Sequence, residues 1–307
     1  MSWFIFAIIG HLANGVAFVI DKILLRSAFT RSATYAGIVG GLSAFVILAS
    51  PFVTVWPDAV SWIIALLSGA LFILALWAFF ASLSRADTSR VVPIVGSLIP
   101  MITLAGSFLF LGERLSDTTF IGFALLIVAT FMLSSGSGGD RPSSQTIWLA
   151  VTSAFLFAIA SVTAKIVYET TGFLGGFVAT RIGAAVMSVV VLCVFDRVAG
   201  GEVMSIVLPK KVKKTKHKQP GAMAGVLALV GQSLGAVGFL FVQWATSEGS
   251  ASVVNAMQAI QYALLVIVAL IFSHRAPGLL GEKFTTRSLI VKIIALWMTA
   301  AGMYLIV

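Results

Sequence analysis

Four polar side chains recur at helical spacing within an apolar stretch near the C-terminal end of the chain. Asn255, Gln258, Gln261 and Tyr262 fall within an arc of roughly 120° if this stretch forms one helix. Amide side chains both donate and accept hydrogen bonds, so a row of them can hold the amino, carboxylate or hydroxyl groups of a small solute. The same amides could instead join neighbouring helices. We favour solute binding, because helix association rarely needs three amides on one face.

A second polar row lies near the N-terminus. His11, Asn14, Asp21 and Lys22 share an arc of roughly 100° on one helical face. Asp21 and Lys22 stand at the end of the stretch, where they could form an ion pair at the mouth of a cavity. Alternatively, Lys22 extends its ammonium group to the membrane interface, and Lys165 in the second half has the same two alternatives. His11 is expected to be a buried, hydrogen-bonded histidine rather than a proton carrier.

Three further residues are candidates for contact with a solute. Gln232 offers another amide, and Trp77 would suit an aromatic solute, although tryptophan more often anchors or packs helices. Arg181 lies about 12 Å into its apolar stretch at 1.5 Å per residue. It could pair with an anionic substrate, or it could snorkel to the interface or pack between helices.

Membrane-spanning helices must position these residues. Hydrophobic residues make up 59% of the 307 residues and charged residues only 10%, which a water-exposed surface could not tolerate. A spanning helix needs roughly 20 apolar residues. Ten such stretches follow one another: 3–21, 34–55, 60–82, 90–111, 117–135, 145–166, 173–194, 221–243, 250–273 and 288–307. The sequence predicts an all-α polytopic protein of a lipid bilayer, the plasma or inner membrane of a prokaryote.

The composition also excludes several classes of function. A single cysteine, Cys193, and three scattered histidines predict neither a disulfide framework nor a metal site, and we expect no cofactor. No clustered acids and no nucleophile–base set occur within the stretches, so we do not expect an enzyme. The basic segment 210–218 has no interleaved aromatic residues, which argues against nucleic-acid binding. It is typical of a topology anchor that touches anionic lipid headgroups.

The positive charges predict an orientation. Of the 20 Lys and Arg residues, 16 fall in alternate connections, on one side of the membrane, and two fall in the connections on the other side. Cytoplasmic connections collect Lys and Arg. The bias therefore places both termini outside the cytoplasm.

The chain carries the same pattern twice. Residues 90–93 (Arg-Val-Val-Pro) recur as residues 252–255 (Ser-Val-Val-Asn), and the Gly-Glu turn at 112–113 recurs at 281–282. We expect two five-helix repeats, 1–139 and 140–307, the second with a long basic loop at 195–220. Because five is odd, the second repeat enters the membrane the opposite way up, which makes the repeats inverted.

Several of these segments resemble a known family. Residues 81–87 (Ala-Ser-Leu-Ser-Arg-Ala-Asp), Pro93, Pro100, residues 111–116 (Leu-Gly-Glu-Arg-Leu-Ser) and Gly122 are similar to the EamA-type repeat of the drug/metabolite transporter superfamily. The second copy departs from it, with Asn255 and Tyr262 in place of the prolines. The resemblance implies ten helices around a central cavity, with helices 1, 3, 4, 6, 8 and 9 beside it and 5 and 10 peripheral. It also implies cytoplasmic termini, whereas the charges place them outside.

The two copies differ in polarity, and this bears on the substrate. Where the related small multidrug exporters carry a membrane glutamate, eight residues before the lysine, this chain has Asn14 and Phe157, and no Asp or Glu occupies the middle of a predicted helix. This favours neutral, zwitterionic or anionic solutes over lipophilic cations. We expect a transporter of an amino acid or related solute that works by alternating access, with a homodimer as an open alternative. The competing interpretations are a flippase for a lipid-linked sugar or phosphate and a membrane scaffold.

Overall fold

The computed structural model describes residues 2–24, 31–86, 88–134, 142–207, 222–272 and 286–306. Within these ranges every regular element is helical. The elements are α1 (Ser2–Leu24), α2 (Ser32–Ser43), η1 (Ala44–Phe52), α3 (Ala59–Leu83), α4 (Thr88–Leu111), α5 (Asp117–Ser134), α6 (Ser144–Thr171), α7 (Phe173–Val190), η2 (Val191–Phe195), α8 (Arg197–Val207), α9 (Ala222–Glu248), α10 (Ala251–Ala256), α11 (Ala259–Phe272) and α12 (Thr286–Ile306). The basic segment 210–218 and the second Gly-Glu turn lie outside the described residues.

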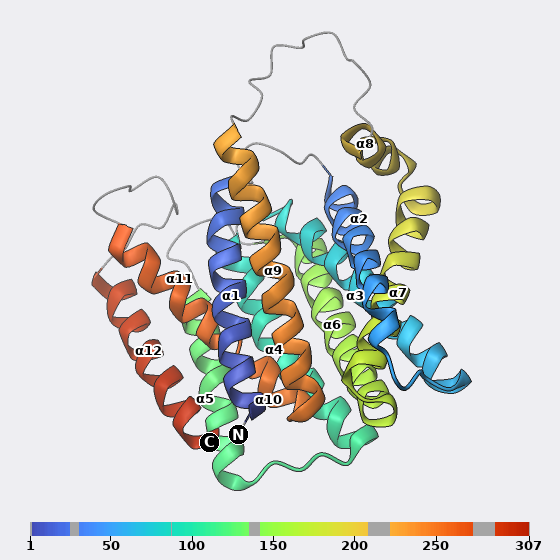
Figure 1. Ribbon diagram of the computed structural model, residues 1–307. Helices are drawn as coiled ribbons and strands as arrows, with labels where there is room; N and C mark the ends of the chain where they lie inside the picture. The colour runs from blue at the N-terminus through green and yellow to red at the C-terminus, as the bar shows by residue number, and fades with distance from the viewer. Residues whose placement is uncertain are drawn as a thin grey trace.

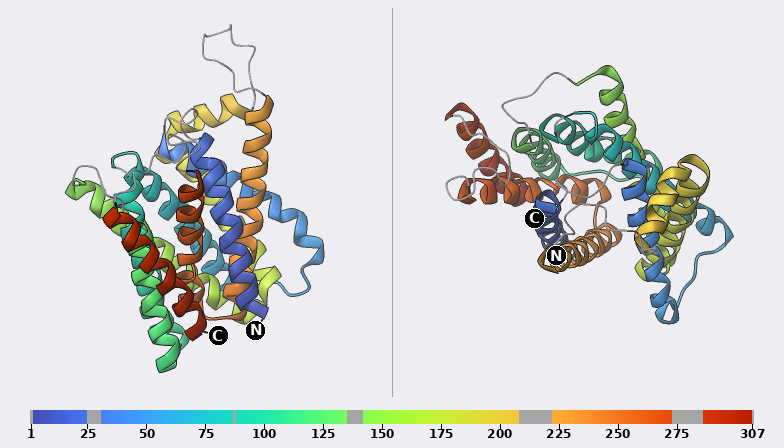
Figure 2. Two further views of the ribbon diagram at one scale, coloured as in Figure 1. Left: turned by 90° about the vertical axis from the view of Figure 1, so that its left-hand side faces the viewer. Right: turned by 90° about the horizontal axis from the view of Figure 1, so that it is seen from above.

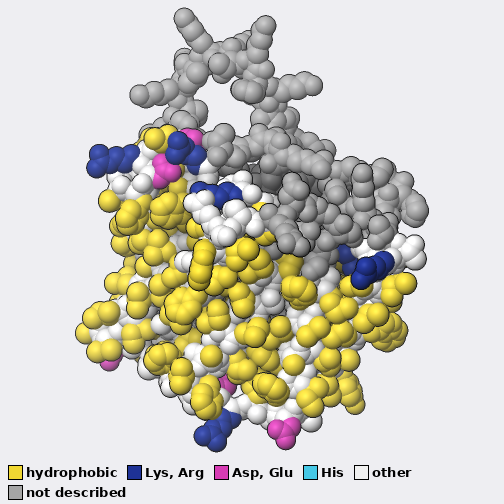
Figure 3. Space-filling view, turned by 180° about the vertical axis from the view of Figure 1, so that it is seen from behind, with side chains coloured by type: hydrophobic (Ala, Val, Ile, Leu, Met, Phe, Trp, Pro, Cys, Tyr) yellow, Lys and Arg dark blue, Asp and Glu magenta, His cyan; other side chains and the backbone are white. Residues whose placement is uncertain are grey.

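The surface of the bundle has the character of a membrane protein. Among the described residues, nine segments are long and apolar enough to span a bilayer. Apolar side chains cover the middle of the molecule in Figure 3, while charged side chains gather toward its two ends. Large side chains such as Leu48, Trp148 and Trp297 are at least 70% exposed on this apolar surface. The prediction of an all-α polytopic membrane protein is confirmed. The predicted stretch 221–243, which corresponds to α9, is not among these nine segments. The count of ten spans therefore stays a prediction.

The helices pair across the two halves of the chain. Helix α1 packs against α9 and helix α3 against α6, so the first helix of each half contacts the third helix of the other (Figure 1). Helices α5 and α12, the last of each half, also pack together, as do α2 and α7. Both termini lie at the same end of the bundle, and α8 lies at the opposite end (Figures 1 and 2). An inverted repeat would pair the helices reciprocally in this way, and the two five-helix repeats stay a prediction.

Glycines bring some of these helices into backbone contact. A Cβ atom on Gly69 of α3 would lie 2.0 Å from the carbonyl oxygen of Thr180 in α7, and one on Gly183 of α7 would lie 2.5 Å from that of Leu66. In lipid, helices associate through close packing rather than through the hydrophobic effect, and small residues permit the closest approach. The α3–α7 crossing therefore depends on the absence of two side chains.

Serine side chains join α3 to α6 in a reciprocal way. Ser68 of α3 donates a hydrogen bond to the carbonyl of Ala160, at 2.8 Å, and Ser153 of α6 donates one to the carbonyl of Ala75, at 2.9 Å. All four residues are buried, so each hydroxyl needs a hydrogen-bond partner within the protein. The two bonds fix the register of one helix against the other.

Three elements differ from the sequence-based expectation. The stretch 250–273 is two helices, α10 and α11, rather than one. The loop predicted at 195–220 begins with a helix, α8, which the side chain of Asp196 caps through the backbone N–H of Ala199, at 3.0 Å. The second stretch changes from an α-helix to a 3₁₀ helix after Ser43, and Pro51, which has no N–H to donate, lies within that 3₁₀ segment.

The α3–α7 crossing gives a test of the fold. Gly69→Val should lower the midpoint of thermal unfolding of the detergent-solubilised protein, because the added side chain would force α3 and α7 apart at about 1–3 kcal/mol or more. Gly41→Val is the matched control, since a Cβ atom at Gly41 meets no atom within 4 Å. Equal midpoints for the two variants would contradict the backbone contact described above.

Candidate solute-binding site

The polar stretch that contains Asn255 and Gln258 is interrupted by a turn. Met257 and Gln258 separate α10 from α11, and Met257 has φ −61° and ψ −8°. The backbone N–H of Gln258 donates to the carbonyl of Asn255, three residues back, at 3.2 Å. An α-helix would have used the carbonyl of Val254 for that bond. The single arc that the sequence predicted for the four polar residues is therefore broken in the middle.

The side chain of His11 forms a hydrogen bond to the carbonyl that this turn leaves without a helical partner. Its Nε2 lies 2.9 Å from the carbonyl oxygen of Val254, and the residue is buried. Because a carbonyl only accepts hydrogen bonds, Nε2 carries the proton. The other ring nitrogen, Nδ1, is enclosed without a hydrogen-bond partner. His11 is thus a buried, hydrogen-bonded histidine, as expected, and it links α1 to α10.

The equivalent position in the other half is apolar, and the helix it faces is continuous. Ala154 of α6, the counterpart of His11, belongs to a buried cluster with Val91 and Val95 of α4. Helix α4 runs from Thr88 to Leu111 even though it contains Pro93 and Pro100. The helix with two prolines is intact, and the helix without them is interrupted.

Asn255 joins three helices. Its Nδ2 donates to Oγ1 of Thr103 in α4 and to Oγ of Ser161 in α6, both at 3.1 Å. The contact crosses between the two halves, because α4 belongs to the first and α10 to the second. In this conformation the amide acts between helices, although it stays half-buried and within reach of an interior solute.

Gln258 and Tyr262 form a second polar pair. The amide of Gln258 donates to the hydroxyl of Tyr262 one turn later. A Cβ atom on Gly96 of α4 would lie 3.0 Å from that hydroxyl, so the tyrosine fits against α4 because residue 96 lacks a side chain. Gln261 approaches α1 through its backbone, beside Gly15. Of the four side chains in the predicted row, those of Gln258 and Tyr262 bond to each other.

The remaining candidates are dispersed. Asn14 packs against Gly238 of α9, where a Cβ atom would lie 2.4 Å from its Oδ1. Trp77 stacks on Phe195 with ring centres 6.1 Å apart, which is a packing role. Gln232 is exposed on α9. The side chains of Asp21 and Lys22 lie outside the described residues, so their ion pair stays a prediction.

Several hydrogen bonds gather around the turn between α9 and α10, at one end of the bundle. Lys165 donates to the carbonyl of Ser247, at 2.9 Å, and lies 3.5 Å from the carboxylate of Glu169. Glu113, from the Gly-Glu turn of the first half, accepts from the hydroxyls of Ser250 and Ser252. Lys165 therefore binds the α9–α10 turn instead of extending freely to the interface. This is the end at which both termini lie (Figure 1).

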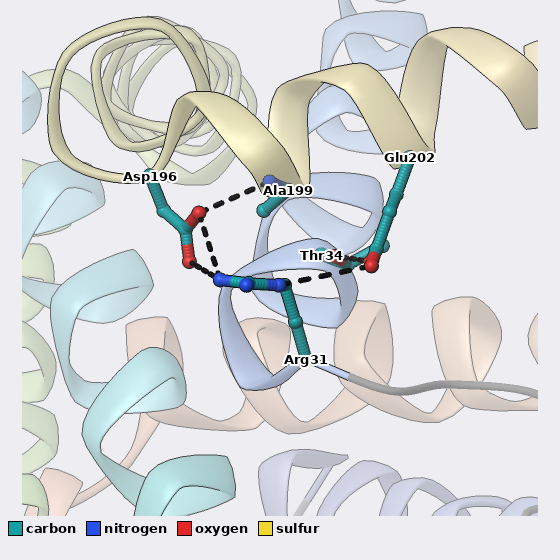
Figure 4. A network of polar contacts seen from close by, with 5 residues as sticks. All are labelled: Arg31, Thr34, Asp196, Ala199 and Glu202. Carbon is teal, nitrogen blue, oxygen red and sulfur yellow. Dashed lines mark hydrogen bonds and ion pairs between the residues drawn. The ribbon is translucent and has the colours of Figure 1, made fainter.

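A charged cluster joins the halves at the other end (Figure 4). Arg31, just before α2, lies 3.2 Å from the carboxylate of Asp196 and 3.8 Å from that of Glu202 in α8. Thr34 donates to the same carboxylate of Glu202. These groups are partly exposed, so the ion pairs contribute little to stability and chiefly orient α8.

Arg181 is buried in the bundle interior. Only 4% of the residue is exposed, and its guanidinium faces the rings of Phe72 in α3 and Phe239 in α9. A snorkelling side chain would reach the polar interface, so that alternative is wrong for this residue. Two positions that sequence reasoning missed, Thr103 and Ser161, carry no distinguishing local signal. Their part in the site depends on contacts with a residue far along the chain.

Comparison with known proteins agrees with the fold and the motifs. Residues 1–135 match the EamA-like transporter family, in agreement with the resemblance that the motifs predicted. This match indicates a membrane transporter of the drug/metabolite type. One solved structure, titled only as the crystal structure of a protein, is similar with a TM-score of 0.65 and 15% identity, over 99% of this chain and 96% of that one. No curated protein matches the chain.

The bond from His11 to Val254 gives a test of the interrupted helix. His11→Phe should lower the free energy of unfolding by about 1–3 kcal/mol, because the released carbonyl would be buried without a partner. Hydrogen exchange should also increase in residues 251–262. His11→Gln, whose amide can still donate, is the matched control and should remain closer to the wild type. Unchanged exchange in His11→Phe would show that the carbonyl does not depend on the histidine.

Proposed function

We propose that this transporter moves a small polar metabolite, an amino acid or a related zwitterionic or anionic solute, by alternating access. The interruption between α10 and α11 carries the proposal. In membrane transporters, interrupted helices near the middle of the bilayer expose backbone groups that bind substrates. Here the interruption brings Asn255 and Gln258 beside helices of both halves. Polar groups placed this way inside lipid are retained for a function far more often than for packing alone.

The contacts at the two ends support a rocking motion. We infer that the repeats 1–139 and 140–307 move against each other, with the end near the termini closed in the described conformation. The contacts that cross between the repeats there are a few side-chain hydrogen bonds, from Ser250 and Ser252 to Glu113 and from Asn255 to Thr103. Each such bond contributes on the order of 1 kcal/mol or less in a membrane protein, so a solute of ordinary affinity can shift the balance between two states.

The first prediction of this proposal concerns Gln258. Gln258→Ala should abolish solute flux into proteoliposomes, measured with labelled amino acids and related solutes, while expression and the thermal midpoint stay normal. The amide should matter because it lies at the interruption and bonds to Tyr262. Gln145→Ala removes an exposed amide at the start of α6 and serves as the control. Wild-type flux in Gln258→Ala would assign Gln258 to helix packing.

The second prediction concerns orientation. We propose that both termini lie outside the cytoplasm, since α8 and the basic residues Arg31 and Arg197 lie at the end opposite the termini. A reporter that fluoresces only in the cytoplasm should stay dark when fused after Val307. The same reporter inserted in the basic segment 210–218 should fluoresce. A bright signal at the C-terminus would reverse the orientation.

A further inference from the structure

A buried arginine near the middle of α7 is surrounded by aromatic rings instead of by a carboxylate. The guanidinium carbon of Arg181 lies 4.5 Å from the ring centre of Phe239, 4.7 Å from that of Phe72 and 5.8 Å from that of Phe177. Its Nε is completely enclosed without a hydrogen-bond partner. Among the described residues, no carboxylate forms an ion pair with it. A buried charge inside the bundle is therefore left without a carboxylate to balance it.

This arrangement is unfavourable without a ligand. Removing an arginine from water carries a large desolvation penalty, and a buried charge normally has a partner of opposite charge. A ring face attracts a cation, but each such contact offsets only a small part of that penalty. The rings thus explain where the guanidinium lies, and they leave most of its hydrogen-bonding capacity unused. A planar guanidinium with free N–H groups matches the geometry of a carboxylate.

A second donor nearby is also without a partner. Tyr168 of α6 is 3% exposed, and its hydroxyl is enclosed with no hydrogen-bond partner. The guanidinium carbon of Arg181 lies 5.8 Å from the ring centre of Phe177, which shares a buried cluster with Tyr168. Tyr168 and Phe177 belong to one buried cluster, against which Phe239 packs. Two unpartnered donors in one apolar cluster define a site for an acceptor that carries negative charge.

The walls of the site are apolar and come from both halves of the chain. The rings of Phe72 and Phe239 have centres 5.3 Å apart, and those of Phe177 and Phe239 lie 6.3 Å apart. The ring series continues through Phe173 to Trp244, toward the closed end. Phe72 belongs to the first half and the other rings to the second. A solute that binds here would contact both moving parts of the proposed cycle.

We propose that Arg181 and Tyr168 bind the carboxylate of an organic anion whose aromatic or apolar body lies among these phenyl rings. The proposal rests on the proposed transport function and narrows its substrate class. An amino acid would bring an ammonium group next to Arg181 without a carboxylate to receive it, so a carboxylate that lacks an amino group fits better. The site selects for net negative charge and for an apolar body.

The test uses four probes and the purified full-length protein in detergent. The probes are 3-phenylpropionate, its uncharged amide, phenylalanine and hexanoate, and the readout is the thermal midpoint as a function of probe concentration, which gives an apparent Kd. We expect 3-phenylpropionate to bind most tightly, hexanoate more weakly, and the amide and phenylalanine weaker by about tenfold or more, since hydrogen bonds to charged groups are the stronger ones. Equal affinity for the amide or for phenylalanine would overturn the proposal, as would the absence of any response.

Substitutions separate binding from packing. Arg181→Met should weaken the binding of 3-phenylpropionate by about 10- to 100-fold. It should leave the thermal midpoint of the ligand-free protein unchanged or raised, because it removes an uncompensated buried charge. A lowered midpoint with unchanged affinity would assign Arg181 to packing. Tyr168→Phe removes only the hydroxyl and should weaken binding by about two- to tenfold, which keeps the site testable if Arg181→Met does not fold. Lys292→Met, at a buried lysine that donates to the carbonyl of Leu133, is the control and should bind normally.

Flux measurements distinguish this inference from the transport proposal. Wild-type protein in proteoliposomes should take up labelled 3-phenylpropionate, and Arg181→Met should not. If Arg181→Met transports the anion as well as the wild type, the site is wrong and the transport function stands. If the anion binds as described but no flux of any solute occurs, the site stands and the transport proposal fails.

Discussion

Inside a bilayer, every backbone N–H and carbonyl group must find its hydrogen-bond partner within the protein. This constraint governs how the interruption between α10 and α11 is stabilised. The turn at Met257 and Gln258 shifts one backbone bond by a residue and releases the carbonyl of Val254. The side chain of His11, in α1, donates a hydrogen bond to that carbonyl. A helix from the first half thus stabilises an irregularity in the second half. The same turn sets the direction of α10, and with it the bonds that Asn255 makes to α4 and α6.

The two halves share a frame and differ where the frame carries polar groups. Backbone contact at glycines, as between Gly122 of α5 and Gly302 of α12, brings the peripheral helices close together. The inner helices of the two halves instead differ from each other in their polar residues. The second half has an interrupted helix with three amides where the first half has a continuous helix with small or apolar residues, while His11 of the first half has Ala154 as its counterpart in the second. Under the proposed transport function, this divergence gives a small solute one asymmetric site in place of two equivalent half-sites.

Much of the fold could be predicted from the sequence, and the site only in part. Apolar stretches of spanning length locate the helices directly, because length and composition are local properties. The interruption at Met257 was not predictable, since Met and Gln favour helices and no Gly or Pro marks the turn. Helix α8 was missed because it lies beside the basic segment, whose composition is typical of a loop. The surroundings of Arg181 come from residues 72, 168, 177 and 239, and no local pattern relates them.

The kinds of contact at the inner helices suggest which parts move. Carbonyl oxygens that face glycines at the α3–α7 crossing leave no room for one helix to slide past the other, so we expect the two repeats to pivot at this crossing. The bonds from Glu113 and Asn255 to the neighbouring helices are single side-chain bonds, which can be exchanged for bonds to water or to a solute. Because Phe72 belongs to the first repeat and Arg181 and Phe239 to the second, an anion held among them would contact both sides of the proposed moving boundary. A ligand shifts a conformational equilibrium only through contacts that differ between the two states, and this is where such contacts would form.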